Sequence, residues 1–398
     1  MIPRLSPPFD RDDAWALLHG WVHPGGTISF ERAMQSYTGM PSALAFSYGR
    51  TGLLALIEVM GWRGKEIILP AYTCAVIPDI ILASGNRPRF VDIETNDFNM
   101  SYGNVANALG SDTAAVLATH MYGFPMDMAP LKSRLEDSGI MLIHDCALAM
   151  GTQYRGEPVW STGEASIFSF SIGKHLSSVE GGILTVSDKN LGHEIETWRN
   201  HNYPRQSKGT MFSKSILFFA SWLGLNATVY PLIHFLDSST PLLKSLTEHF
   251  RTTELKLPDD LRCRLADPFG AIGANQMGNL LNILHKKRVL AQLYYKALKK
   301  TPGIVLPTPL EGASWSHVPC LPEDRSGFIS FMKARGIHVG TELFDYVVPD
   351  FPLYKDYADD NFTNARKAAA HIALIPNAHN LNNGQIEHIT SSLHEYVG

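Results

Sequence analysis

The segment Ile167-Phe168-Ser169-Phe170-Ser171-Ile172-Gly173-Lys174-His175-Leu176 decides how the rest of the chain is interpreted. An apolar, strand-favouring run ends there, and small and polar residues lead to a single lysine. A lysine in such a place can be partly removed from water, which lowers its pKa and makes its amine a nucleophile. Upstream, the apolar run Met141–His144 ends in a carboxylate, Asp145. An amine and a carboxylate at the ends of buried strands suit pyridoxal phosphate, because the acid keeps the ring nitrogen protonated and the amine forms the Schiff base.

The bulk composition is that of a globular protein. The 398 residues are enough for one large core and a smaller second domain, with 45% hydrophobic and 18% charged residues. The formal net charge of -4 does not indicate a basic surface for nucleic acid, so we expect no nucleic-acid partner. The cysteines have no paired spacing, which predicts neither a metal site nor disulfides. The N-terminal residues lack an apolar signal core, so we expect a cytoplasmic protein.

Short apolar strands alternate with helical stretches between residues 43 and 200. The expected strands are Glu66–Pro70, Pro88–Asp92, Ala114–Ala118 and Ile140–His144, and the expected helices are Leu53–Met60, Ala75–Ser84 and Met128–Ser138. This alternation predicts an α/β fold with a mostly parallel central sheet and helices on both faces. Ligands bind such sheets at the carboxyl ends of the strands, where Asp145 and Lys174 are expected.

The remaining chain predicts a second, smaller unit. Apolar spacing over Ala271–Lys300 favours one long helix, and residues 303–398 mix short strands with amphipathic helices. We therefore expect a large cofactor-binding domain over residues 1–260, with an irregular apolar insert at about 205–256. Residues 261–398 would form the long helix and a small C-terminal α+β domain.

The segment Ser215–Leu236 contains no Asp, Glu, Lys or Arg. Its length would just span a bilayer, but polar and helix-breaking residues interrupt it. One interpretation is a buried or dimer-facing helical pair. The other is an interfacial patch that docks peripherally on a membrane, with Arg205, Lys208 and Lys214 close by.

A series of motifs extends over nearly the whole chain in a specific order. They are Gly49-Arg50-Thr51-Gly52-Leu53, Pro70-Ala71-Tyr72-Thr73-Cys74, Val91-Asp92-Ile93, Met121-Tyr122-Gly123, Asp145-Cys146-Ala147, the Lys174 segment, Arg199-Asn200-His201 and Arg264-Leu265-Ala266-Asp267. Together they resemble the DegT/DnrJ/StrS aminotransferases, which are fold type I, aspartate aminotransferase-like enzymes that use pyridoxal phosphate. The resemblance implies transfer of an amino group, from glutamate in most relatives, to a keto group of a nucleotide-activated sugar or related metabolite in polysaccharide or secondary-metabolite biosynthesis.

The resemblance also implies roles for residues around the cofactor ring. Lys174 would form the Schiff base and move a proton between substrate and cofactor. Some relatives carry histidine at this position and perform dehydration, so the lysine favours transamination. Asp145 would pair with the ring nitrogen, and Ala147 would pack on one ring face. Cys74 falls on the opposite face, where many relatives have an aromatic residue, and Leu148 replaces a Gln or His that contacts the ring hydroxyl.

The phosphate of the cofactor is expected at the start of a helix. The resemblance assigns it to Arg50 and Thr51 through backbone amides, which suit an anion at a helix N-terminus, and to the hydroxyl of Ser169. Arg262 falls about where relatives place an asparagine from the second subunit. This implies a homodimer with shared active sites.

Two alternatives differ from an aminotransferase. The same lysine and carboxylate would serve another pyridoxal phosphate-dependent reaction, such as an elimination. The Ser215–Leu236 segment would also fit a non-catalytic, membrane-associated sensor or scaffold.

Overall fold

The computed structural model describes residues 1–225, 255–341, 344–358 and 361–396. At its centre lies a seven-stranded sheet in the order β1-β9-β8-β5-β4-β2-β3. Its strands are β1 (Ser42–Phe46), β2 (Glu66–Pro70), β3 (Arg87–Val91), β4 (Thr113–Thr119), β5 (Met141–Asp145), β8 (Ala165–Ser169) and β9 (Gly182–Val186). The strands from β3 to β8 are parallel, and β9 runs antiparallel to both of its neighbours. The prediction of a mostly parallel sheet is confirmed.

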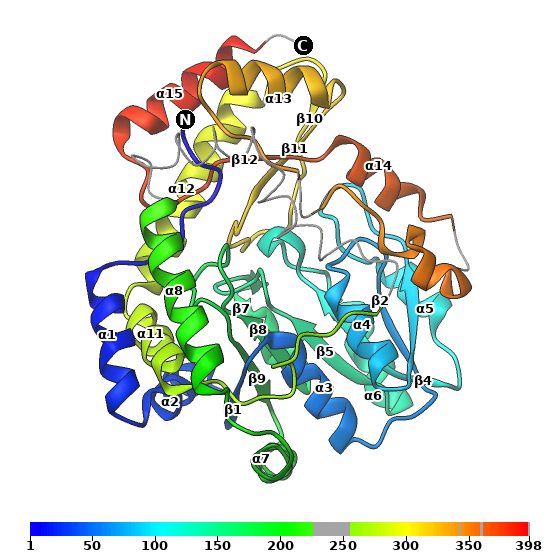
Figure 1. Ribbon diagram of the computed structural model, residues 1–398. Coiled ribbons are helices and arrows are strands. Elements are labelled where there is room, and N and C mark those ends of the chain that lie inside the picture. The colour runs from blue at the N-terminus through cyan, green and yellow to red at the C-terminus, as the bar shows by residue number, and fades with distance from the viewer. Residues whose placement is uncertain (226–254, 342–343, 359–360, 397–398) are drawn as a thin grey trace.

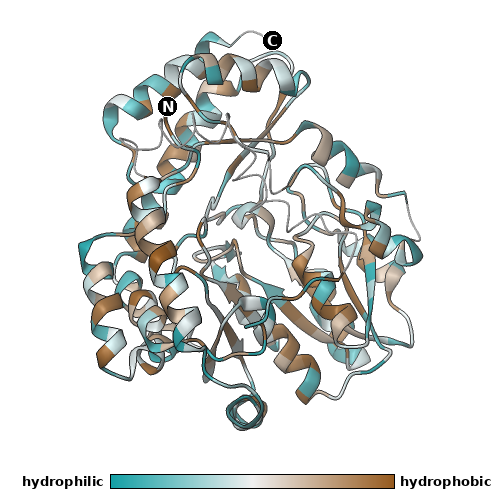
Figure 2. Cartoon of the chain, viewed as in Figure 1, coloured by the Kyte–Doolittle hydropathy of each residue, from teal (hydrophilic) through white to brown (hydrophobic). Residues whose placement is uncertain are grey.

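The expected strands agree with the observed ones to within one residue at each end. Strand β2 has the expected bounds, and β3, β4 and β5 differ from theirs by a single position. Their side chains are largely buried, as expected for a sheet covered on both faces, and parts of the central strands are brown in Figure 2. Continuous apolar runs of this length therefore located the strands well.

Helices pack around the central sheet, and the N-terminal helices α1 (Arg11–Val22) and α2 (Gly26–Thr38) lie beside it (Figure 1). The helices that follow its strands along the chain are α3 (Gly49–Val59), α4 (Val76–Ala83), α5 (Tyr102–Ala108), α6 (Ala129–Ser138) and α7 (Lys189–Asn202). The N-terminal helices α1 and α2 pack against α11 (Asp267–Met277). Helix α1 begins with a capping box, in which the side chains of Asp10 and Asp13 each accept a bond from the other's backbone N–H.

The prediction of one long helix over Ala271–Lys300 is wrong. Helix α11 ends at Met277, and a second helix, α12, spans Leu280–Leu298. At the junction, the N–H groups of Gly278 and Asn279 bond to carbonyls three residues back, which tightens and ends the first helix. Glycine and asparagine both have low helix propensity, which is consistent with a break at this point. The break was not visible in the sequence, because the helical spacing of apolar residues continues across it.

A smaller antiparallel sheet lies in the C-terminal half. It consists of β10 (Ile304–Val305), β11 (Val318–Pro322) and β12 (Ala373–Ile375), in that order. Helices α13 (Arg325–Ala334), α14 (Thr363–His371) and α15 (Asn383–Glu395) accompany it, and Figure 1 shows α13 and α15 together with this sheet at the top. Shorter elements are the hairpin β6 (Gln153–Tyr154) and β7 (Glu157–Pro158) and the 3-10 helices η1 (Met121–Gly123), η2 (Val159–Thr162), η4 (Val348–Asp350) and η5 (Pro352–Tyr357). A domain boundary at residue 260 stays a prediction.

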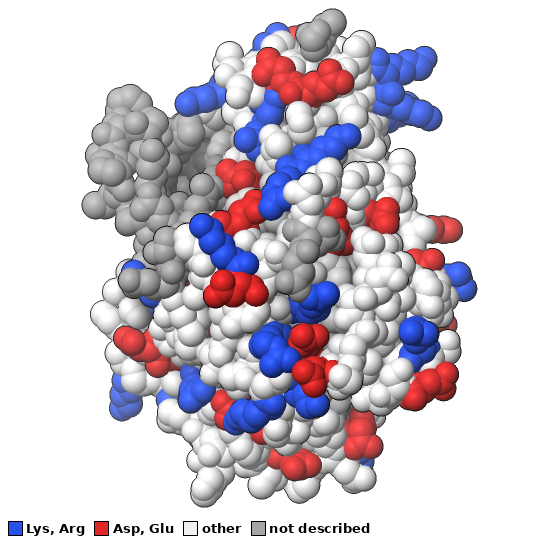
Figure 3. Space-filling model, turned by 90° about the vertical axis from the view of Figure 1, so that its right-hand side faces the viewer, with Lys and Arg blue, Asp and Glu red and all other residues white. Residues whose placement is uncertain are grey.

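Helix α8 (Lys208–Gly224) forms the first part of the apolar insert. It lies beside α1, because the indole Nε1 of Trp21 donates to the hydroxyl of Ser215 at 3.1 Å. The rest of the Ser215–Leu236 segment, from residue 226 on, lies outside the described residues. Within the described part of the chain, no helix combines the length and apolar character needed to cross a membrane. On the face shown in Figure 3, basic and acidic side chains are interspersed.

Candidate active site

The ends of β5 and β8 meet at one edge of the central sheet. Asp145 is the last residue of β5 and lies opposite Ile167 of the neighbouring β8. Strand β8 ends at Ser169, and the loop that leads to β9 carries Lys174. The parallel register thus brings the predicted carboxylate and the predicted amine to the same carboxyl edge.

Asp145 is a buried carboxylate with a fixed orientation. It is 5% exposed, and its Oδ1 accepts the backbone N–H of Ala147 at 3.0 Å. Burial raises the pKa of Asp145, and the Ala147 bond and the charge of Lys174 oppose this rise. A cationic group placed against the carboxylate, such as a protonated ring nitrogen, would favour its ionised form.

Lys174 lies within electrostatic range of Asp145 and Cys74. Burial lowers the pKa of the Lys174 amine, and the thiol of Cys74 and the carboxylate of Asp145 act in the opposite direction. The result is an amine that loses its proton more readily than a lysine in water, as a nucleophile requires. The structure therefore brings together Lys174, Asp145, Ala147 and Cys74.

The start of helix α3 is packed against the end of β8. A Cβ atom on Gly49 would lie 2.8 Å from the carbonyl oxygen of Phe168 and 3.6 Å from the Cα of Ser169. Only glycine permits this approach, which sets Arg50 and Thr51 beside Ser169. The first N–H groups of a helix have no carbonyl partner within it, and they form a natural cradle for a phosphate.

Thr51 contributes to this cradle differently from the prediction. Its backbone N–H donates to the carbonyl of Tyr48 at 3.1 Å, and its buried hydroxyl donates to the carbonyl of Leu261 at 2.7 Å. The side chain of Thr51 therefore fastens the segment that follows the apolar insert onto α3. The hydroxyl of Ser169 lies 3.3 Å from that of Ser171.

Arg262 is not near Lys174 in the described chain. Its Nη2 lies 3.1 Å from Oε1 of Glu58, in the C-terminal part of α3, and its side chain is 56% exposed. A role for Arg262 in the site of a second subunit stays a prediction.

The sequence did not reveal the histidine that the C-terminal half brings to this site. Burial, and after it the charges of Arg4, Lys287 and Lys174, hold the pKa of His317 well below its ordinary value. His175 is buried as well, and burial lowers its pKa well below the ordinary value. His317 belongs to no recognisable motif, and only the folding of the C-terminal half beside Lys174 makes it a neighbour.

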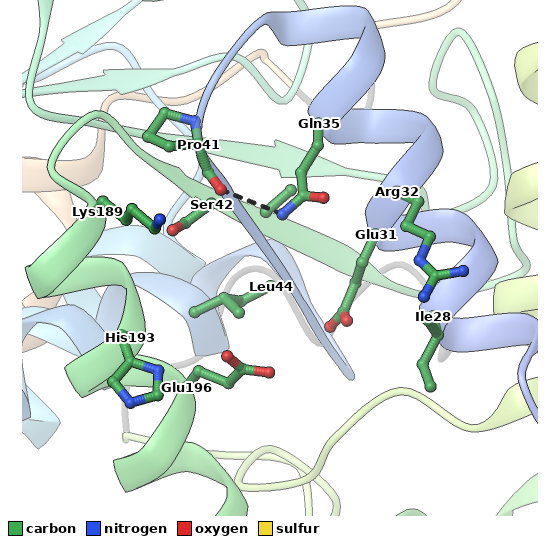
Figure 4. A pocket seen from close by; sticks show the side chains of 11 residues that line it. Ile28, Glu31, Arg32, Gln35, Pro41, Ser42, Leu44, Lys189, His193 and Glu196 are labelled. Atoms are coloured by element: carbon green, nitrogen blue, oxygen red, sulfur yellow. Dashed lines mark hydrogen bonds between the residues drawn. The ribbon is translucent and has the colours of Figure 1, made fainter.

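A separate surface pocket of about 260 Å³ lies between α2, β1 and α7 (Figure 4). Glu31, Lys189, His193 and Glu196 are among its lining residues, and none of the predicted site residues lines it. Glu31 is engaged there by the guanidinium of Arg199 at 2.6 Å. This pocket is therefore separate from the predicted site at the strand ends.

A comparison with protein families decides the identity. The model of the DegT/DnrJ/EryC1/StrS aminotransferase family matches residues 10–230 and 251–394. The chain belongs to this family. It is therefore a pyridoxal phosphate-dependent aminotransferase, and the packing of α3 on β8, with Asp145 and Lys174 at adjacent strand ends, fits that cofactor.

Individual members of the family show how far the similarity extends. The chain is 31% identical to the protein MosB of Rhizobium meliloti over 47% of its own length, and this match spans only 37% of MosB. It is 24% identical to the dTDP-4-dehydro-2,3,6-trideoxy-D-glucose 4-aminotransferase of Saccharopolyspora spinosa, over 95% of this chain and 91% of that one. Among solved structures, the E. coli GDP-4-keto-6-deoxy-D-mannose-3-dehydratase with bound hydrated pyridoxal phosphate superposes with a TM-score of 0.77 at 19% identity, covering 99% of both chains.

Proposed function

We propose that this aminotransferase moves an amino group from glutamate to a keto group of a nucleotide-activated sugar, in polysaccharide or secondary-metabolite biosynthesis. The observation that carries the proposal is the meeting of the Lys174 amine and the buried Asp145 carboxylate beside the start of α3. Family members that act on dTDP- and GDP-linked sugars support the substrate class.

Each residue has a separate task. Pyridoxal phosphate, when bound, supplies an electron-accepting ring. Lys174 would hold the cofactor aldehyde and move a proton to or from the substrate carbon, since its lowered pKa makes the neutral amine accessible. Asp145 would keep the ring nitrogen protonated, and its bond to Ala147 fixes the direction of the carboxylate. The start of α3 and Ser169 would hold the phosphate.

The half-reaction with the donor tests this proposal. Purified enzyme loaded with pyridoxal phosphate and given glutamate alone should release close to one 2-oxoglutarate per site. Lys174→Ala should abolish both this release and the covalent capture of the cofactor by borohydride. If the wild-type enzyme captures the cofactor but no common amino donor yields its keto acid, transamination is wrong. An elimination or related reaction at the same site would then replace it.

We further propose a homodimer in which Arg262 completes the phosphate site of the partner. The exposure of the Arg262 side chain supports this, because it leaves the guanidinium accessible to a second chain. Sharing of sites would make the activity depend on the concentration of dimer.

We also infer that this cytoplasmic enzyme contacts a membrane peripherally through α8 and α1. From Gly209 to Gly224 the one charged residue is Lys214, and it points inward to Asp260. Both α8 and the neighbouring α1 expose large apolar side chains, namely Phe212, Ile216, Leu217 and Leu223 together with Trp15, Leu18 and Val22. A helix whose exposed residues after the first turn are uncharged and largely apolar suits the boundary of a bilayer.

A further inference from the structure

Helix α8 is connected to the start of α3 through the phenol of Tyr48. This residue precedes Gly49, and its hydroxyl donates to Oδ1 of Asp260 at 2.7 Å. The ammonium of Lys214, on α8, donates to Oδ2 of the same carboxylate at 2.5 Å. It also lies 2.5 Å from Oε2 of Glu180. A single lysine of the apolar insert thus pairs with two carboxylates.

Two cations share the ring of Tyr48. The guanidinium carbon of Arg50 lies 4.3 Å from the ring centroid, and the ammonium of Lys214 lies 4.9 Å from it. Contacts of this kind hold a cation in place without neutralising it. Lys214 has two carboxylate partners, whereas Arg50 has no carboxylate at ion-pair distance within the described residues.

The position of Arg50 points toward the cofactor site. It is the second residue of α3, beside the end of β8. Its charge lowers the pKa of Cys74, as that of Lys174 does, against the larger effect of burial. Arg50 and Lys174 therefore both lie within electrostatic range of the same thiol. Arg50 also belongs to the first turn of α3, whose leading N–H groups would receive an anion.

We propose that the Arg50 guanidinium, and not only the backbone at the start of α3, binds the phosphate group of pyridoxal phosphate. Tyr48 supports the guanidinium from one side, and Asp260 holds the phenol in place. Lys214 is a positioning residue, because without its charge the carboxylates of Glu180 and Asp260 would attract Arg50 away from the phosphate. This inference rests on the proposed function, since it assigns a residue to the cofactor of that same site.

The test compares pyridoxal phosphate with pyridoxal, which lacks the phosphate. The dissociation constants of both are measured on the apoenzyme by fluorescence quenching, and their ratio reports recognition of the phosphate alone. Arg50→Gln should lower this ratio about 10- to 100-fold, as expected for a hydrogen bond to a charged group, and leave pyridoxal binding unchanged. The matched control is Arg63→Gln, which removes an exposed arginine that bonds only to the carbonyl of Trp62 among the described residues.

The role of Lys214 is tested on the same ratio. Lys214→Met should lower the preference for pyridoxal phosphate over pyridoxal, whereas Lys214→Arg should keep most of this preference. Adding Glu180→Gln to Lys214→Met should recover part of the preference, because it removes the unpaired carboxylate. Lys208→Met, on the exposed first turn of α8, should have no effect. A merely structural role for Lys214 would weaken pyridoxal and pyridoxal phosphate equally, and this would overturn its part of the proposal.

The outcomes separate this inference from the proposed function. If the wild-type apoenzyme does not prefer pyridoxal phosphate to pyridoxal, the assignment of the cofactor itself is wrong. If the wild type does prefer it and Arg50→Gln keeps the full preference, the guanidinium assignment alone is wrong. The same conclusion follows if Arg50→Gln keeps the ratio but weakens binding of dTDP or GDP to the loaded enzyme, since the guanidinium would then serve the diphosphate of the substrate.

Discussion

At the scale of single residues, Asp145 is a carboxyl group whose ionised form is disfavoured by burial. Burial raises the pKa of its carboxyl group. The Ala147 amide and the Lys174 ammonium oppose this rise. A bound cofactor with a cationic ring nitrogen would add a third favourable partner. The carboxylate and the ring nitrogen should therefore stabilise each other's charge.

Replacing this charge without changing its shape tests the pairing. Asp145→Asn keeps an acceptor for the Ala147 N–H. It removes the negative charge that would stabilise the protonated ring nitrogen. We expect the rate constant of the donor half-reaction to fall about 10- to 100-fold or more, corresponding to the roughly 1.5–3 kcal/mol of a hydrogen bond to a charged group. Single-turnover release of 2-oxoglutarate measures the effect. Asp137→Asn, at an exposed position of α6, is the control, and equal activities of the two variants would contradict the role of Asp145.

The ends of β4 and β5 carry a buried pair of histidines that should make the protein sensitive to acid. Nε2 of His120 lies 3.0 Å from Nδ1 of His144. The N–H of Met126 donates to Nδ1 of His120 at 3.1 Å, and Nε2 of His144 faces the hydroxyl of Thr162. This chain of bonds assigns one proton to each ring, so both rings are neutral. Burial lowers the pKa of His144 to about 3 and that of His120 well below its ordinary value.

The sign of the resulting pH dependence follows from the unfolded state. There both histidines take up protons below an ordinary pKa of about 6.5, while the folded state stays neutral. Their contribution to stability is therefore complete above about pH 6.5. It falls by roughly 1.4 kcal/mol per pH unit for each histidine as the pH drops further.

Urea unfolding at several pH values between 6 and 4.5 measures this dependence. In His144→Gln, we expect the free energy of unfolding to fall less steeply with decreasing pH, by the contribution of about one histidine. The variant His193→Gln, at an exposed position, should keep the full pH dependence. An unchanged slope in His144→Gln would show that other groups cause the loss of stability in acid.

At the scale of elements, the apolar outer face of α8 gives a direct membrane prediction. Phe212, Ile216 and Leu223 are 63%, 54% and 62% exposed. Changing all three to serine should abolish flotation with anionic liposomes and leave activity in solution unchanged, since none of them contacts the site. Burying these side chains would contribute roughly 1.5–3 kcal/mol each, enough to make binding measurable. The inward neighbour Phe218 is fully buried and is left intact. A wild-type protein that stays unbound at low salt would contradict the membrane contact.

The sequence predicted elements well where their signals are local. The buried strands β2 to β5 have continuous apolar runs, so their bounds could be placed to within one residue. The break between α11 and α12 was missed, because the apolar spacing runs through Gly278 and Asn279 without interruption. Periodicity reports which side chains face the core, and it does not report where backbone hydrogen bonds change partner.

At the scale of the whole molecule, the candidate site combines predictable and unpredictable parts. The approach of Lys174 to Asp145 could be predicted, because Asp145 ends β5, the loop with Lys174 follows β8, and parallel strands end at a common edge. The support of Arg50 by Tyr48 and Lys214 could not, since residues 48 and 214 meet only through the docking of α8. His317 likewise reaches the site from the C-terminal half. Contacts between distant segments leave no local signal in the sequence.

A mixing experiment tests whether two subunits share their sites. Lys174→Ala should inactivate the site of its own chain, and Arg262→Gln should weaken the site of the partner. When the two inactive or weakened variants are unfolded together and refolded in equal amounts, half of the dimers should be mixed. In each of these, one site contains native Lys174 from one chain and native Arg262 from the other, so roughly a quarter of the wild-type activity should return.

The ion pair of Arg262 supplies the control for this experiment. Arg262 contacts Glu58 of its own chain, so Glu58→Gln removes the same pair and leaves the guanidinium in place. If Arg262 acts across the interface, Glu58→Gln should keep its activity and its affinity for pyridoxal phosphate, whereas Arg262→Gln should lose both. Equal losses in the two variants would assign Arg262 to the packing of its own α3. Mixed dimers seen by native mass spectrometry without any recovery of activity would show that each chain completes its site alone.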